Sequence, residues 1–145
     1  MHIQRTRSIA APPTTVIALL HDLNEIARWA PAQIQIEVGE PSGDAVPLAA
    51  NIPLGPLGQR RFEGEAHLLA DGLRCVATSP IALDLRWAVT EQGAHSLVTA
   101  SAEADLEPML GPVARAVPDA LIDRVVGQQL DTSLDALEQS VPQAL

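Results

Sequence analysis

The chain has 145 residues, which suits one compact domain, and its 47 % apolar and 19 % charged residues are the balance of a folded protein. Its net charge of −9 repels phosphate backbones, so we expect no nucleic-acid partner. No apolar run approaches the roughly 20 residues that a membrane span needs, and no signal-peptide pattern is present. We therefore predict one cytoplasmic domain over residues 1–145, without stable membrane insertion.

The first predicted elements are a strand and two short helices. We expect the strand over residues 2–10, followed by a Pro-Pro-Thr-Thr run that starts a helix over 13–21 with Thr14 as its N-cap. Apolar residues at mixed helical spacings extend the pattern into a second helix over 22–29. Pro31 closes that helix, because the residue before a proline is pushed out of the helical region.

Six further strands are predicted from alternating apolar and polar residues. Turn residues of the Pro-Ser-Gly-Asp, Asp-Gly and Gln-Gly types separate several of them, which favours antiparallel pairing. The connection over 53–58 is apolar, and the sequence leaves open whether it is a lid over a cavity or an interface. The strands are expected at about 33–38, 46–52, 61–69, 73–79, 83–89 and 95–106.

Helical spacing returns at the C-terminal end of the chain. Apolar residues form one stripe of a helix over 119–141, with Asp119 as its N-cap or first-turn acid and Pro142 after its end. A sheet with one apolar face needs a cover, and this helix is the only predicted element long and amphipathic enough to supply it. The predicted fold class is therefore α+β, with about seven antiparallel strands beneath a long C-terminal helix.

Short motifs near both ends of the chain carry a family resemblance. They are Arg-Ser-Ile-Ala-Ala-Pro-Pro-Thr-Thr-Val at 7–16, His-Asp-Leu at 21–23, Trp-Ala-Pro at 29–31 and Leu-Asp-Ala-Leu-Glu at 134–138. Together with the element order, they make nearly the whole chain resemble the START-like, or SRPBCC, superfamily, in particular its bacterial polyketide cyclase/dehydrase-like branch. The resemblance implies a helix-grip domain whose cavity, between a curved sheet and the C-terminal helix, takes lipids, sterols, quinones, polyketides or plant hormones.

The four histidines give little support for catalysis. His67 shares its strand face with charged residues including Glu65, which is typical of a solvated face, so we favour surface ion pairing over a general base. His2 and His95 are expected to be exposed. His21 is interpreted as a helix-end residue that contacts terminal carbonyls, with a place on a cavity rim as the alternative.

The cysteine and the motif search likewise point away from cofactor chemistry. Cys75 is expected to point inward, where apolar surroundings keep a thiol protonated and inert. The sequence contains no HExxH, CxxC, phosphate-loop or dinucleotide-binding motif, so we expect no metal and no cofactor.

Alternation predicts an inward face almost free of ionisable groups, which includes Val38 and Leu68. Three successive inward alanines, Ala100, Ala102 and Ala104, lie opposite the long helix. Either that helix sits unusually close to their strand or a cavity lies there, and we favour the cavity. Polar contacts to a ligand are expected from the helix, at Gln128, Gln129, Thr132 and Ser133. The predicted ligand-binding residues are Phe62, Ala66, Cys75, Ala77, Leu85, Trp87, Val98, Ala100, Ala102, Ile122, Val126, Gln129, Leu130 and Ser133.

These observations favour a carrier or binding protein for a hydrophobic small molecule of polyketide, lipid or quinone type. The first alternative is an enzyme of cyclase/dehydratase (aromatase) type without metal or nucleotide cofactor. It requires a group such as Glu103, Asp105 or His67 to reach the cavity through a one-residue slip of register. The second alternative, based on the apolar loop 53–58, is a protein-interaction module or homodimer.

Overall fold

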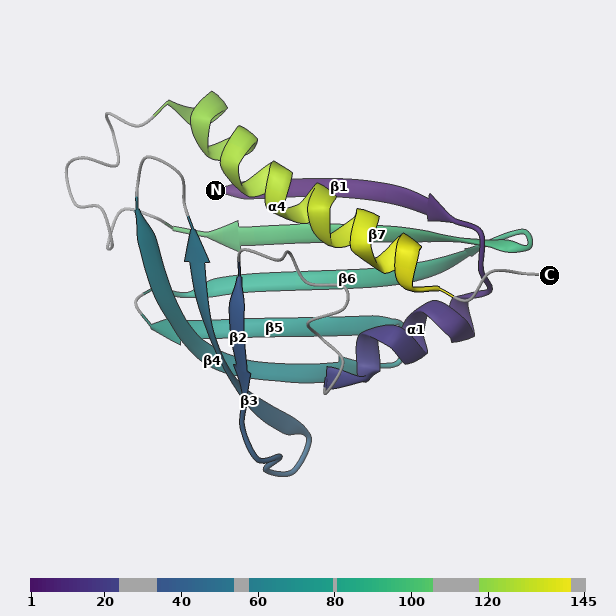
Figure 1. The fold of residues 1–145 in the computed structure, drawn as a ribbon, viewed down its shortest axis with the longest axis horizontal. Helices are drawn as coiled ribbons and strands as arrows, with labels where there is room; N and C mark the ends of the chain where they lie inside the picture. Colours follow the sequence, from purple (N-terminus) through teal and green to yellow (C-terminus); the bar gives the residue numbers. More distant parts are fainter. Residues whose placement is uncertain (24–33, 54–57, 80, 106–117, 142–145) are drawn as a thin grey trace.

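Seven antiparallel strands form one curved sheet in the computed structural model, which describes residues 1–23, 34–53, 58–79, 81–105 and 118–141 (Figure 1). The first strand pairs with the last one, and two helices lie within the described residues. The structure thus confirms the predicted α+β helix-grip class. In the order of the sheet, the strands are β1 (His2–Ile9), β7 (His95–Ala104), β6 (Leu83–Gln92), β5 (Gly72–Ser79), β4 (Gln59–Leu69), β3 (Ala45–Pro53) and β2 (Gln35–Val38).

The first helix, α1 (Pro13–His21), has the predicted bounds, but its predicted cap is wrong. Pro12 is the N-cap, Thr14 lies inside the helix, and no side-chain hydrogen bond caps it. A proline at the first helical position already has a helical φ, and it has no N–H that needs a partner. The predicted helix over 22–29 and the proline after it lie almost wholly outside the described residues.

A bulge in β5, where Thr78 is the extra residue between the pairs Glu63–Ser79 and Gly64–Ala77, helps to curve the sheet. The register between β4 and β5 shifts between Glu63 and Gly64, and a bulge bends its strand and increases the local twist. Gly64 is required there, because a Cβ atom would collide with the Val76 carbonyl and stand 2.6 Å from the Ala77 Cα. In Figure 1, β2 and β3 rise steeply across the direction of the other strands, so one end of the sheet wraps toward the helix side.

The long helix, α4 (Asp119–Ser140), lies over the opposite edge of the sheet, formed by β1 and β7 (Figure 1). Its buried leucines, Leu130, Leu134 and Leu137, recur at helical spacing and join one core with Val98 of β7. Pro118 is the N-cap, so Asp119 is the first-turn acid and not the cap.

Two residues of the predicted inward face are exposed. Leu68 is 45 % exposed and Val38 is 39 % exposed, and each lies at or next to the end of its strand. Alternation predicts the face of a strand correctly there, but it does not predict where the cover over that face ends.

Candidate functional site

A cavity of about 170 Å³ lies between the N-terminal half of α4 and the part of the sheet formed by β2 to β6. The steep rise of β2 and β3 supplies one wall, and the helix supplies the other. The lining is Met1, Ile34, Ile36, Leu48, Ala50, Ile52, Phe62, Gly64, Glu65, Cys75, Val76, Ala77, Ile81, Leu83, Leu85, Trp87, Ala102, Leu121, Ile122, Val125, Val126, Gln129, Leu130 and Ser133.

The structure brings most of the predicted ligand-binding residues into this wall. Those in the wall are Phe62, Cys75, Ala77, Leu85, Trp87, Ala102, Ile122, Val126, Gln129, Leu130 and Ser133. Ala66, Val98 and Ala100 do not line it, and all three belong to the packed core. The sequence-based set missed Ala50 of β3, although it continues the apolar alternation of its strand.

The predicted position of the cavity, along the three alanines of β7, is wrong. Ala100 and Ala102 are 0 % exposed and Ala104 is 8 % exposed, and only Ala102 lines the cavity. Large residues of β6 pair with two of them, Trp87 with Ala100 and Leu85 with Ala102. The small side chains therefore allow close packing of β6, β7 and α4, and the space lies farther along the sheet.

The polar groups of the wall are already hydrogen-bonded within the protein. Trp87 Nε1 donates to Ser133 Oγ over 3.2 Å, and the Ser133 hydroxyl donates to the Leu130 carbonyl oxygen over 2.7 Å. Gln129 is half-buried, and its Nε2 donates to the carbonyl oxygen of Pro53 over 3.4 Å. Gln128 and Thr132, the other helix residues predicted to contact a ligand, are exposed and do not line the cavity.

The thiol of Cys75 is the titratable group set deepest in the described wall. Burial raises its pKa to about 12, and the nearby Asp84 carboxylate adds to the shift. The thiol is therefore protonated at neutral pH and is a poor nucleophile, as expected from its inward position.

The residues named for the enzyme alternative, Glu103, Asp105 and His67, do not line the cavity. Glu103 is exposed, and the β6–β7 pairing runs without a register shift from Leu83–Ala104 to Gln92–His95. Glu65 belongs to the wall, but its carboxylate is 55 % exposed and lies 3.5 Å from His67 Nε2.

His21 ties α1 to the sheet. Because carbonyl oxygens only accept, His21 Nε2 donates, to the carbonyl oxygens of Leu69 (2.7 Å) and Gly72 (2.9 Å). These carbonyls belong to the β4–β5 turn, so the expected contact with the carbonyls of its own helix end is wrong. His21 does not line the cavity.

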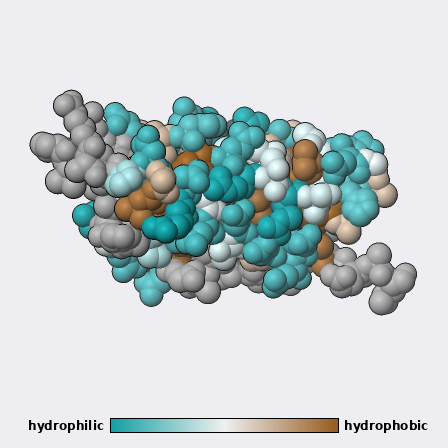
Figure 2. All heavy atoms as spheres, turned by 90° about the horizontal axis from the view of Figure 1, so that it is seen from above, coloured by the Kyte–Doolittle hydropathy of each residue, from teal (hydrophilic) through white to brown (hydrophobic). Residues whose placement is uncertain are grey.

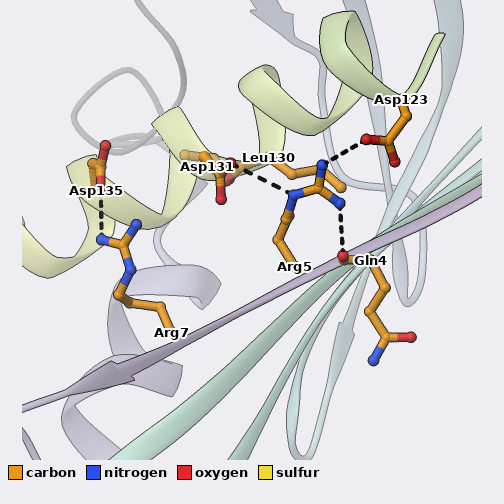
Figure 3. Close-up of polar contacts among 8 residues, drawn as sticks. Gln4, Arg5, Arg7, Asp123, Leu130, Asp131 and Asp135 are labelled. Carbon is orange, nitrogen blue, oxygen red and sulfur yellow. Dashed lines mark hydrogen bonds and ion pairs between the residues drawn. The ribbon is translucent and has the colours of Figure 1, made fainter. Parts of the chain in front are cut away.

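Two arginines of β1 fasten α4 on the flank away from the cavity (Figure 3). Arg5 is paired with Asp123 over 3.1 Å and with Asp131 over 3.5 Å. Arg7 is paired with Asp135 and Glu138, and the Asp135 carboxylate gives the largest of the effects that raise the pKa of Arg7.

The surface seen from the α4 side is largely hydrophilic, and hydrophobic atoms gather mainly toward the end where α4 begins (Figure 2). Among the described residues, no helix has the length and apolar character to cross a bilayer. In that same part of the chain, no group of three or more His, Cys, Asp or Glu residues could hold a metal ion.

Comparisons with known proteins agree with this architecture. Residues 1–142 match a family model described as "Polyketide cyclase / dehydrase and lipid transport". Similar solved structures include TTHA0849 from Thermus thermophilus (19 % identity, TM-score 0.74, 96 % of this chain and 95 % of that one). Another is a START superfamily protein from Mycobacterium smegmatis (16 % identity, TM-score 0.72, 97 % of this chain and 96 % of that one). A third is the Zhui aromatase/cyclase from Streptomyces sp. R1128 (18 % identity, TM-score 0.70, 96 % of this chain and 92 % of that one). No curated protein matches the chain.

Proposed function

The chain belongs to the polyketide cyclase/dehydrase and lipid transport family, and on that premise we propose that it binds a hydrophobic small molecule in the cavity between α4 and the sheet. The observation that carries the proposal is the composition of the wall, in which nearly every lining side chain is aliphatic or aromatic. Ligand pockets are mostly apolar with a few placed polar groups, and this wall has that composition.

Binding is better supported than catalysis. General acid–base catalysis needs a titratable group within reach of the substrate, and nucleophilic catalysis needs an activated nucleophile. Among the wall residues that the structure describes, Cys75 has a raised pKa and the Glu65 carboxylate lies toward solvent beside His67. A cyclase/dehydratase role remains the alternative, because positioning alone can accelerate the folding and closure of a reactive chain.

A pair of variants in one strand tests the proposal. Ala50 lines the cavity beside Phe62, whereas the next residue back, Ala49, is half-buried on the other face between Glu37 and Glu63. Phenylalanine at position 50 fills the cavity, and phenylalanine at position 49 does not. We expect Ala50→Phe to weaken binding of 2-naphthol, measured by isothermal titration calorimetry, at least tenfold, and Ala49→Phe to change it less than twofold.

Thermal unfolding of both variants is the control for folding. The proposal fails if wild-type protein does not bind 2-naphthol at concentrations up to its solubility. It also fails if a folded Ala50→Phe variant binds as tightly as wild type, because the ligand then lies elsewhere.

A further inference from the structure

The inner end of the cavity lies where Trp87 of β6 meets Ser133 of α4. On β6 the lining extends as far as Trp87, and the next inward residue, Val89, is buried in the packed core. On α4 the lining extends as far as Ser133, and the residue after it, Leu134, is wholly buried. Both elements therefore leave the cavity and enter the core at the same level.

The strands on either side of β6 stop lining the cavity at this level too. Trp87 is paired with Leu73 of β5 and with Ala100 of β7; both partners are 0 % exposed, and neither lines the cavity. Two residues farther along their strands, Cys75 and Ala102 do line it. Trp87 has the largest of the three side chains at this level, so its indole separates the cavity from the core behind it.

A hydrogen bond holds the Trp87 indole in this position. Its Nε1 donates to Ser133 Oγ over 3.2 Å, and the Ser133 hydroxyl donates to the Leu130 carbonyl oxygen over 2.7 Å. Ser133 is 2 % exposed and, with Ser96, is one of the two buried polar residues in the described part of the chain. A buried hydroxyl without partners is costly, so this serine is tolerated in α4 because it pairs with both the indole and its own helix.

Resting on the proposed function, we propose that Trp87 determines how long a ligand the cavity accepts, and that Ser133 is the positioning residue that holds the indole across the inner end. Protein interiors are close-packed, and the residues behind the indole, Leu73 and Ala100, belong to the packed core. A longer ligand cannot advance in that direction unless the indole moves. Ser133 acts on the ligand through Trp87.

A substitution that shortens Trp87 tests the first part of the inference. The probes are 2-naphthol and 2-hydroxyanthracene, which has the same hydroxyl group and one more fused ring, and the fluorescence of each probe reports its binding. In Trp87→Leu, the space left by the indole joins the cavity, so we expect the affinity ratio to shift toward 2-hydroxyanthracene by about fivefold or more relative to wild type.

A ratio that stays within about twofold of wild type in a folded Trp87→Leu variant overturns the inference but leaves the proposed function standing. If wild-type protein binds neither probe, the proposed function fails, and the inference fails with it. Thermal unfolding establishes whether the variant is folded, because truncating a buried tryptophan is strongly destabilising. If Trp87→Leu does not fold, the Ser133 variant below decides.

A matched pair of serine variants tests the positioning role. Ser133→Ala removes the acceptor of the indole N–H, so the NMR signal of the Trp87 indole N–H should move upfield, and the affinity ratio should shift toward 2-hydroxyanthracene by about threefold or more. Ser96→Ala removes an equally buried hydroxyl, which donates to the Ala11 carbonyl over 2.7 Å and does not line the cavity. It should change neither the signal nor the ratio. An unchanged ratio in Ser133→Ala, or an equal shift in Ser96→Ala, contradicts the positioning role.

Discussion

The contact between Gly127 of α4 and Arg5 of β1 predicts an energetic coupling that neither residue alone would suggest. Gly127 is buried, and a Cβ atom built there would stand 2.8 Å from Arg5 Cζ, too close to be tolerated. The guanidinium is the end of a flexible side chain, so Gly127→Ala should displace Arg5 and leave α4 in place. Displacement should separate Arg5 from Asp123 and Asp131.

Two effects of similar size then oppose each other. Alanine in a helix interior is more stable than glycine by up to about 1 kcal/mol. The Arg5 side chain is 30 % exposed and its partners 58 % and 49 %, so losing both ion pairs costs about 0.5–2 kcal/mol. We expect Gly127→Ala to be between about 0.5 kcal/mol stabilising and about 1 kcal/mol destabilising in wild type. In an Arg5→Ala background, it should be stabilising by about 1 kcal/mol.

Urea unfolding of the four proteins of this double-mutant cycle gives the coupling free energy, which we expect at about 0.5–2 kcal/mol. The matched control is a second cycle between Gly127→Ala and Arg7→Ala. Arg7 pairs with Asp135 and Glu138 and is not among the close neighbours of a Cβ at Gly127, so that cycle should be additive. Additivity within about 0.3 kcal/mol in the Arg5 cycle would refute the reasoning.

Three further predictions concern the core and the cavity. Leu134 is 0 % exposed, so Leu134→Ala should lower the free energy of unfolding by about 2–5 kcal/mol. Leu68 is 45 % exposed, so Leu68→Ala should lower it by less than about 1 kcal/mol; urea unfolding measures both changes. Ala100→Leu should destabilise by about 1–3 kcal/mol through overpacking, whereas Ala50→Leu, beside the cavity, should cost less than about 1 kcal/mol; equal costs would contradict the position of the cavity. The pKa of Cys75, raised from 9.0 to about 12, predicts slow alkylation by iodoacetamide at pH 8 and faster alkylation once guanidinium unfolds the protein. It also predicts that the free energy of unfolding falls as pH rises from 9 toward 12, because the folded state holds the proton more tightly than the unfolded state does.

Most of the fold could be predicted from residue periodicity, because a half-buried strand alternates and an amphipathic helix repeats every three to four residues. In β6, Trp87 and Val89 are buried, whereas Arg86 before them and Thr90 after them are exposed and Ala88 between them is half-buried, as alternation requires. The N-cap of α1 was missed because Pro13 already provides a helical φ at the first position, which makes a side-chain cap at Thr14 unnecessary.

The ion pairs of β1 illustrate what periodicity cannot supply. Arg5 and Arg7 alternate with Gln4 and Thr6, so their common face was predictable, yet their charge argued against an inward position. They point inward because β1 is the edge strand, and α4 presents acidic side chains within reach of that edge. Partners that lie more than 100 residues away in the chain leave no local signal, and only the tertiary structure places them together.

The cavity was predicted in kind and misplaced because a run of alanines has two meanings. Small side chains can leave space, or they can let a neighbour approach, and the path of α4 decides between the two. Arg5 beneath Gly127 draws that helix close to β1 and β7, and Trp87 covers the neighbouring Ala100. The sheet is too wide for one helix to cover, so the space opens on the far side, where β2 and β3 rise across the direction of the other strands (Figure 1). The polar fastening on one flank of α4 and the apolar cavity on the other therefore follow from the same placement of the helix.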